Sequence, residues 1–322
     1  MSTEIAPPSP AEPSTAAGAT TAAGASDGAS VRRGIVSAAL IIAAGNLLSR
    51  LLGMGREVVA ANYFGTGEGI KPFVIADSLL TILYDLLISG MVTAALVPVL
   101  SEFAAPERRG ELRRVVGTLL TLAALVTGGA TVLLVWFAPG LVRLWLAAGS
   151  ETVDAELLPE TVRNVRLILP AVTLLGFSAI LTAANYALGR FAWPTVAQAA
   201  RNGAIIVATV ALAGWLRVTS MVVGVLIGAA LLIALQLPGL RDAPPRLAFD
   251  LRHPAVRRIF RLYAPIFIGL FATTAGVLID RRLAWRAGED ALGAMRYATT
   301  LQQLVLGLVA AGIALGALPA LS

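Results

Sequence analysis

Cysteine is absent from the 322 residues, and histidine occurs once, as His253. Without thiols the chain forms neither disulfides nor thiolate metal sites. A single imidazole also disfavours a zinc site or a catalytic triad that uses histidine. Charged residues are scarce, at 14% against about 25% in average soluble domains, while hydrophobic residues reach 57%. These proportions predict a polytopic membrane protein.

The first 30 residues have almost no large apolar side chains. They are mostly alanine, serine, threonine, proline and glycine, which cannot bury enough surface to offset the entropy lost on ordering. We therefore expect a disordered tail at 1–30. A signal peptide is not expected, because no cationic region opens the chain.

Eight apolar stretches are long enough to cross a bilayer, for which about 20 residues suffice because the hydrocarbon core is roughly 30 Å thick. A lipid-exposed backbone must satisfy its own hydrogen bonds, so each stretch is expected to be a helix. The sequence predicts an all-α, polytopic membrane helical bundle of about eight transmembrane helices. The expected spans are 35–56, 73–100, 115–137, 164–188, 194–215, 218–238, 262–284 and 296–320.

The net charge of +6 comes from arginines that lie in short loops between the spans. In a soluble chain such an excess suggests a nucleic-acid partner, but here anionic lipid and membrane topology explain it. The loop at 149–160 is acidic and is expected on the opposite side. The positive-inside rule then places both termini in the cytoplasm. The basic segments expected on the cytoplasmic side are Arg32 and Arg33, 106–114, Arg190 and 241–261.

Two arginines are predicted inside the first span. Only 16 residues separate Arg33 from Arg50, and they extend roughly 24 Å as a helix, so the helix must continue through Arg50. Arg50 then either faces water or a counter-charge, or extends to the lipid headgroups. Arg56 is expected closer to the aqueous end, about 120° around the helix. Gly53 and Gly55 are predicted to bend the helix and turn both arginines inward.

Acidic residues are predicted inside the second span. Asp85 lies mid-way along it, where a short carboxylate cannot reach water at the surface, so it is expected to be functional or paired. Asp77 is about 80° away on the helix and is predicted to share a wall with Asp85. Asp85 either pairs with one of the two arginines of the first span or contacts substrate or an ion. Arg201, early in the fifth span, and Arg217, at its end, are predicted to mark membrane interfaces.

A series of motifs carries a resemblance to a known family. These are "SRLLGMGREVVAANYFG" (49–65), "SGMVTAALVPVLSEF" (89–103) and "LTAANYALGRFAWPTVAQAARN" (181–202), with weaker counterparts at 235–241 and 315–322. Their order and spacing resemble the MurJ/MviN lipid II flippases of the multidrug, oligosaccharidyl-lipid and polysaccharide exporter superfamily. The resemblance covers essentially the whole chain after residue 34.

The resemblance implies a flippase, involved in cell-wall biogenesis and cell shape, that moves a polyprenyl-diphosphate-linked peptidoglycan precursor across the bacterial cytoplasmic membrane by alternating access. A cationic cavity would receive the headgroup, with Arg50 and Arg56 as anion receptors. Guanidinium suits this role, because it is always charged and grips phosphate oxygens in a fork. The expected partners are a lipid-linked anionic substrate, the phospholipid bilayer and cell-wall synthesis proteins, without nucleic acid.

The chain departs from the family pattern at several charges. Lys71 stands where the family has an acidic residue, and Asp85 where it has an arginine, so the two changes leave the local charge sum unaltered. By spacing, Thr300 replaces a further family arginine. The expected substrate-binding residues are Arg50, Arg56, Asp85, Asp77 and Lys71.

The family has about fourteen helices in two halves that rock against each other. This chain is expected to contain a six-helix lobe at 31–240, a basic loop at 241–261 and the first two helices of a second lobe at 262–322. The simplest interpretation is a fragment or truncated product, and a dimer or a non-transporting relative are the alternatives.

Two other functions stay open. One is an exporter of another polysaccharide lipid or of drugs, coupled to Na⁺ or H⁺ through Asp77 or Asp85; no other cofactor is expected. The second is a cell-wall scaffold that transports nothing. An enzyme is not predicted, because a membrane-embedded transferase needs acidic or metal-binding clusters in its loops, and these loops carry mostly arginine.

Overall fold

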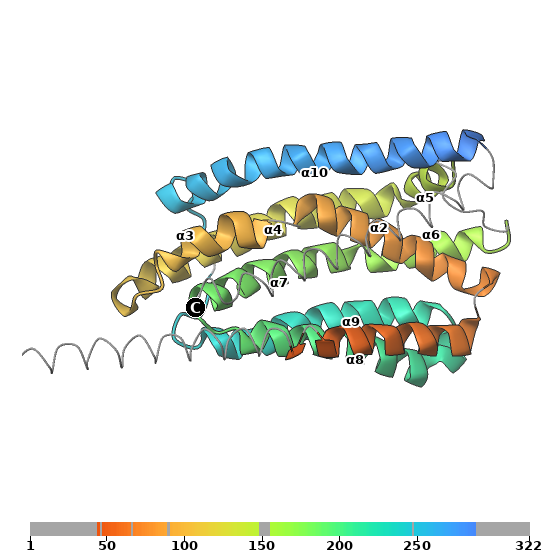
Figure 1. Ribbon diagram of the computed structural model, residues 1–322, viewed down its shortest axis with the longest axis horizontal. Helices are drawn as coiled ribbons and strands as arrows, with labels where there is room; N and C mark the ends of the chain where they lie inside the picture. The colour runs from red at the N-terminus through yellow and green to blue at the C-terminus, as the bar shows by residue number, and fades with distance from the viewer. Residues whose placement is uncertain are drawn as a thin grey trace, which may run out of the picture.

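The computed structural model describes residues 44–287, except 46, 66, 89, 90, 148–154 and 247. The regular elements of this part are helices, which run side by side along the long axis of the molecule (Figure 1). Five of the helical segments are long and apolar enough to cross a membrane. The predicted all-α membrane fold is thereby confirmed. The predicted tail at 1–30 and the predicted span at 296–320 lie outside the described residues, so the number of eight spans stays a prediction.

The described chain begins with a helix that runs without a break from 47 to 64. Three 3₁₀-helices and one π-helix join some of the longer helices. The 3₁₀-helices are η1 (Glu68–Ile70), η3 (Pro106–Arg108) and η4 (Leu237–Leu240), and the π-helix is η2 (Val92–Leu96). The α-helices are α2 (Lys71–Leu87), α3 (Val97–Ser101), α4 (Arg109–Trp136), α5 (Ala138–Ala147), α6 (Leu158–Ile168), α7 (Pro170–Ala187), α8 (Ala192–Leu216), α9 (Thr219–Gln236) and α10 (Pro254–Ala287).

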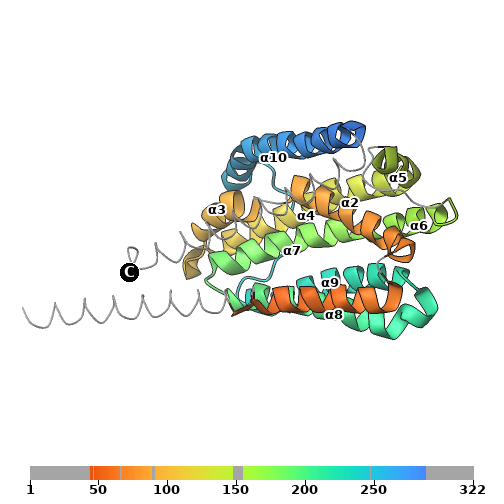
Figure 2. The same ribbon diagram turned by 45° about the vertical axis from the view of Figure 1, so that its right-hand side comes forward.

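The helices form a bundle with α7 near its middle. Helix α7 contacts α4 on one side and α9 on the other. Helices α8 and α9 pack tightly together and lie beside the 47–64 helix, while α10 runs along the opposite side of the bundle (Figures 1 and 2). There α10 contacts α2, η2, α3 and α4. The bundle therefore has two flanks that are joined through α7 and α2.

The first helix extends further than the predicted span, which was expected to end at 56. The residues after the Arg56–Glu57 pair are again apolar or small, so the helical pattern continues to Phe64. It ends at Gly65, whose φ of 70° is the left-handed conformation that glycine adopts after a helix. The helix is continuous at Gly53 and Gly55, so these glycines do not interrupt it, and a bend there stays a prediction. Arg50 and Arg56 consequently keep different directions around the helix.

The predicted second span, 73–100, is a broken helix. Helix α2 ends at Leu87, and the chain resumes as the π-helix η2 before it returns to α-helix in α3. Ser89 and Gly90 lie between them in the sequence, and such pairs lower helix propensity and favour kinks. Inside a membrane a broken helix is tolerated where its backbone is buried in protein or lines a water-filled cavity. A cavity or a protein-covered site is therefore expected among the helices around the break.

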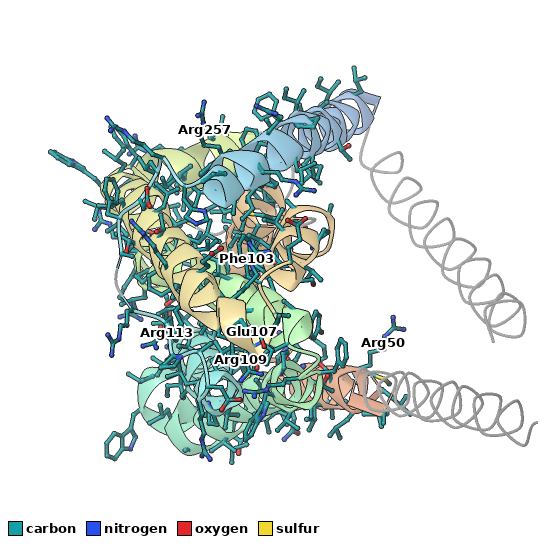
Figure 3. All side chains as sticks on the ribbon, turned by 90° about the vertical axis from the view of Figure 1, so that its left-hand side faces the viewer. Arg50, Phe103, Glu107, Arg109, Arg113 and Arg257 are labelled. Carbon is teal, nitrogen blue, oxygen red and sulfur yellow. The ribbon has the colours of Figure 1, made fainter. Side chains whose placement is uncertain are left out.

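The basic loops gather at one end of the bundle, which Figure 3 views directly. Arg109 and Arg190 both pair with Asp242, and the hydrogen bond and charge of Arg190 lower the pKa of that carboxyl. Arg114 pairs with Asp250 at 2.9 Å. Segments 106–114, Arg190 and 241–261 are thus on one side, as predicted from the sequence. Helix α10 already begins at Pro254, so the last part of the predicted loop is helical.

Close packing of α8 on α9 depends on glycines of α9. A Cβ on Gly224 would lie 2.8 Å from the Cα of Ile205, and a Cβ on Gly228 would lie 2.9 Å from the carbonyl oxygen of Arg201. These distances are too short for any side chain. Small residues at such positions let membrane helices approach closely, where packing supplies most of the attraction.

Gly224→Ala should therefore destabilise the protein. The added methyl forces α8 and α9 apart, and overpacking of this kind costs about 1–3 kcal/mol. The control is Gly203→Ala on α8, where a Cβ meets nothing within 4 Å. Alanine is the better helix former by about 1 kcal/mol, so this control should be neutral or stabilising. Thermal unfolding of the purified protein in detergent measures both, and equal midpoints for the two variants would contradict the packing account.

Candidate functional site

A polar hollow of about 560 Å³ lies among α2, α7 and α8, next to the break in the second span. Most of its lining comes from three helices, and η2 and α9 add one residue each. The lining residues are Leu80, Thr81, Tyr84, Asp85, Val92, Leu175, Ser178, Ala179, Thr182, Tyr186, Pro194, Thr195, Gln198, Arg201 and Leu232. We call this cavity the polar hollow. Its volume falls within the range of about 300–1,000 Å³ that ligand pockets occupy.

Asp85 lies in the last turn of α2 and lines the polar hollow. Its side chain is exposed, and α2 ends two residues later. The structure does not contain the pairing with Arg50 or Arg56 that the sequence left open, because no ion pair joins Asp85 to another described residue. Arg56 pairs instead with its neighbour Glu57, at 2.5 Å. Asp85 thus presents its carboxylate to the hollow.

Arg201 also lines the polar hollow, and the sequence analysis missed it. The residue lies nine positions after the start of α8, roughly 14 Å along the helix, and contributes to a cavity between helices. That it marks a membrane interface stays a prediction. Its Nε is buried and has no hydrogen-bond partner in the described structure. An arginine this far inside an apolar span is a functional candidate by default. Its depth in the helix was therefore a signal that the sequence already carried.

Asn202 fixes the position of Arg201 relative to the first helix. Its amide donates to the carbonyl oxygen of Ser49 at 3.0 Å and to the hydroxyl oxygen of Ser49 at 3.1 Å. Ser49 directly precedes Arg50, so the motif at 49–65 and the motif at 181–202 meet at this contact. The first helix is thereby anchored to α8 beside the hollow.

Asp77 lies on α2 outside the residues that line the hollow. The charges that act on its carboxylate are those of Arg56, Arg201 and Glu57. The structure therefore brings Asp77, Arg56 and Arg201 into one electrostatic group. The predicted wall shared by Asp77 and Asp85 is not formed at this hollow, because only Asp85 lines it.

Two of the predicted site residues lie away from the polar hollow. Arg50 is exposed, and Figure 3 shows its side chain projecting away from the packed helices. Lys71 begins α2 and forms an ion pair with Glu68. Fourteen residues of helix, about 21 Å, separate Lys71 from Asp85, so the two exchanged charges are not neighbours. Thr300 lies outside the described residues.

Neutral polar groups hold the wall between α7 and α9. Gln236 donates to the hydroxyl of Ser178 at 2.8 Å and accepts from Thr182 at 2.9 Å. Asn185 donates to the carbonyl oxygen of Gln236 at 3.3 Å. Gln236 and Asn185 are fully buried, and such a bonded network fixes the two helices in register. Ser178 and Thr182 are thereby positioned at the edge of the hollow.

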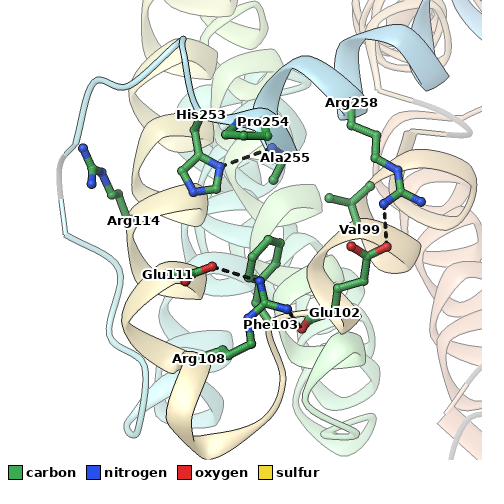
Figure 4. Close-up of a pocket in the computed structure, with 10 residues that line it drawn as sticks. All are labelled: Val99, Glu102, Phe103, Arg108, Glu111, Arg114, His253, Pro254, Ala255 and Arg258. Atoms are coloured by element: carbon green, nitrogen blue, oxygen red, sulfur yellow. Dashed lines mark hydrogen bonds and ion pairs between the residues drawn. The ribbon is translucent and has the colours of Figure 1, made fainter.

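A second hollow, of about 460 Å³, lies at the basic end of the bundle (Figure 4). Its arginines are paired: Arg108 contacts Glu111 at 3.0 Å and Arg258 contacts Glu102 at 2.7 Å. His253 accepts a hydrogen bond on Nδ1 from the backbone of Ala255 at 3.2 Å, so it caps the start of α10. These contacts explain the charges at this end as structural, in contrast to those of the polar hollow.

Comparison with known proteins gives a consistent match. The family model described as lipid II flippase MurJ matches residues 60–322. The chain is 28% identical over 295 residues to "Lipid II flippase MurJ" of Burkholderia cenocepacia, which covers 88% of this chain and 56% of that protein. It is 28% identical over 308 residues to "Probable lipid II flippase MurJ" of Vibrio cholerae, covering 91% and 58%. The chain thus spans little more than half the length of these relatives.

Solved structures match the fold. A structure titled "Lipid II flippase MurJ, inward closed conformation" superposes with a TM-score of 0.63 at 20% identity, covering 84% of this chain and 56% of that one. An outward-facing multidrug resistance MATE family transporter of the MOP superfamily gives 0.64 at 12% identity, covering 83% and 60%. At these identities the likeness concerns the fold alone.

If the polar hollow holds water, a cysteine placed in it should react with a water-soluble thiosulfonate reagent, because the thiolate is the reacting form. The natural absence of cysteine allows single-cysteine variants without a background. Gln198→Cys should react about tenfold faster or more than the control Val207→Cys. Both residues lie on α8, but Val207 is an exposed valine that does not line the hollow. Equal labelling rates in membranes would contradict a wet hollow.

Proposed function

We propose, from the premise that this chain belongs to the lipid II flippase MurJ family, that it moves a polyprenyl-diphosphate-linked peptidoglycan precursor across the bacterial cytoplasmic membrane. The observation that carries the proposal is the polar hollow, whose lining between the helices includes the charged side chains of Arg201 and Asp85. A charged side chain within a membrane span is costly unless water or a ligand meets it. A headgroup that is polar and anionic supplies such contacts.

The lipid tail and the headgroup have different requirements. The headgroup must cross the hydrocarbon core without losing its polar contacts, and a hollow lined by helices provides them. The tail can remain among the exposed apolar side chains that face lipid, such as Val207 and Val210 on α8. Alternating access would open the hollow first to one side and then to the other. The break between α2 and α3 offers a place where such a movement can occur.

The five substrate contacts predicted from the sequence remain proposals, and they differ in how close they lie to the polar hollow. Asp85 lines the hollow, while Arg56 and Asp77 belong to the electrostatic group next to it. Arg50 is exposed on the same helix as Arg56 and would meet the headgroup outside the hollow. Lys71 lies furthest away, at the start of α2, and would act near the membrane surface.

Arg50→Ala tests this function. The purified full chain would be reconstituted in vesicles with a labelled lipid II precursor, and headgroup exposure on the far leaflet would be followed with an impermeant reagent. Loss of a hydrogen bond to a charged group costs about 1.5–3 kcal/mol, so translocation should slow by roughly tenfold to a hundredfold. The control is Arg143→Ala, an exposed arginine on α5. An unchanged rate in Arg50→Ala removes this residue from the mechanism, and no translocation by the unaltered chain contradicts the proposed function.

A second candidate function is export coupled to a gradient of Na⁺ or H⁺. The observation that favours it is that Asp85 forms no ion pair with another described residue and lines the polar hollow, which leaves its carboxylate available to a cation. Asp85→Asn should then abolish the dependence of transport on the ion gradient while gradient-independent exchange persists. The measurement is transport in vesicles with and without an imposed gradient. A gradient effect of equal size in Asp85→Asn would exclude coupling through this residue.

A further inference from the structure

Arg201 is an unusual arginine because its charge is partly balanced while its donors are not used. Asp77 attracts the guanidinium and Arg56 repels it. No hydrogen bond or ion pair joins Arg201 to another described residue, although a guanidinium carries five N–H donors. Its Nε is buried without a partner. An unmet buried donor costs about 1–3 kcal/mol, so the site is built at a cost to stability.

Packing fixes the base of this side chain. Gly228 of α9 approaches both the backbone of Arg201 and its Cγ, and a Cβ at Gly228 would lie 3.0 Å from that Cγ. Asn202, the next residue, is bonded to Ser49. The backbone and Cγ of Arg201 are therefore held in place, and the side chain lines the polar hollow. A preorganised donor of this kind binds an anion without first losing its own freedom.

The rest of the polar hollow is not cationic. Asp85 contributes a carboxylate from α2, and Tyr84, Gln198 and Thr182 contribute neutral donors and acceptors. Since Asp85 and Arg201 do not pair, the hollow holds a separate acceptor and a separate anion receptor. Simple phosphate would meet repulsion from the carboxylate. A phosphate that carries a hydroxylated group would satisfy both, because a hydroxyl can donate to Asp85 while the phosphate oxygens accept from Arg201.

We propose that Arg201 is a substrate-contacting residue that grips a phosphate oxygen of the headgroup, and that Asp85 sets the orientation of the attached sugar by accepting a hydrogen bond from its hydroxyl. This assignment rests on the proposed function, since it takes the polar hollow as the headgroup site. It adds an anion receptor on α8 to the arginines of the first helix. It also gives Asp85 a role that needs no coupling ion, because its carboxylate accepts a hydrogen bond from a neutral hydroxyl group.

The test uses the purified full chain in detergent and three soluble probes: glucose 1-phosphate, glucose and inorganic phosphate. Calorimetric titration should show tighter binding of glucose 1-phosphate than of either other probe. Arg201→Gln should weaken glucose 1-phosphate about tenfold or more, and Arg201→Lys less, because lysine keeps the charge and loses the fork. Asp85→Asn should weaken glucose 1-phosphate but leave inorganic phosphate unchanged or tighter, since the repelling charge is gone.

The control is Arg217→Gln, because Arg217 directly follows α8 as its C-cap and lines a different cavity. It should bind glucose 1-phosphate as the unaltered chain does. A melting curve separates a binding role from a structural one: Arg201→Gln should keep an unfolding midpoint close to that of the unaltered chain while it loses affinity, because Arg201 makes no hydrogen bond to another described residue that the substitution would remove. If that variant does not fold, Arg201→Lys decides, and full affinity in a folded Arg201→Lys variant overturns the fork contact.

Unchanged binding by Arg201→Gln, or no saturable binding of glucose 1-phosphate by the unaltered chain, overturns the proposal. Its failure is distinguishable from failure of the proposed function. Translocation of the lipid-linked precursor by an Arg201→Gln variant at the full rate would count against Arg201 alone. Arg201-dependent binding of glucose 1-phosphate without any translocation would support the site and count against the flippase function.

Discussion

The cost of placing a charge inside a membrane is the constraint on which this structure depends. At the basic end the arginines meet carboxylates, as Arg109 and Arg190 do with Asp242 and Arg258 does with Glu102. These pairs lie where loops and water are close, and each adds little to stability. Inside the bundle the same residue type needs a different solution. Arg201 and Asp85 line a hollow and form no ion pair with each other, so the protein keeps two charged side chains within its helices without pairing them.

The interruption of the second span belongs to the same solution. A continuous α-helix has no spare backbone polar groups, whereas the end of α2 and the π-helical turn η2 leave some that must be satisfied. The break lies beside the hollow, and Val92 of η2 lines it. The irregular backbone of this span therefore lies where polar groups are close by. The network of Gln236, Ser178 and Thr182 supports the facing wall without adding charge.

Much of the fold follows from hydrophobic patterns, because a span must be apolar over a fixed length. The predicted spans 194–215 and 218–238 agree closely with α8 and α9, and the grouping of basic loops at one end was also correct. The end of the first helix was not, since the helix continues past Arg56, which pairs with Glu57, to Phe64. Hydropathy averages the apolar character of a stretch of residues and does not detect an ion pair between two of them.

The site was harder to predict than the fold, because it depends on which faces of distant helices meet. Asp85 was identified from its depth alone. Arg201 was assigned to an interface, and the sequence does not show that α8 brings it to the lining of the hollow. Lys71 and Asp85, whose charges are exchanged relative to the family pattern, are close in the sequence but lie about 21 Å apart along the helix. Charge sums along a sequence therefore say little about the field within one cavity.

The glycine contacts of α9 have a mechanical consequence. Gly224 and Gly228 leave no room for a side chain between α9 and α8, and Asn202 bonds α8 to the first helix. The first helix, α8 and α9 are therefore expected to move as one unit. Arg201 belongs to that unit, whereas Asp85 lies on α2 next to a break. A change in the distance between Arg201 and Asp85 is then expected to come from displacement of α2. That distance would therefore report how far the bundle has opened.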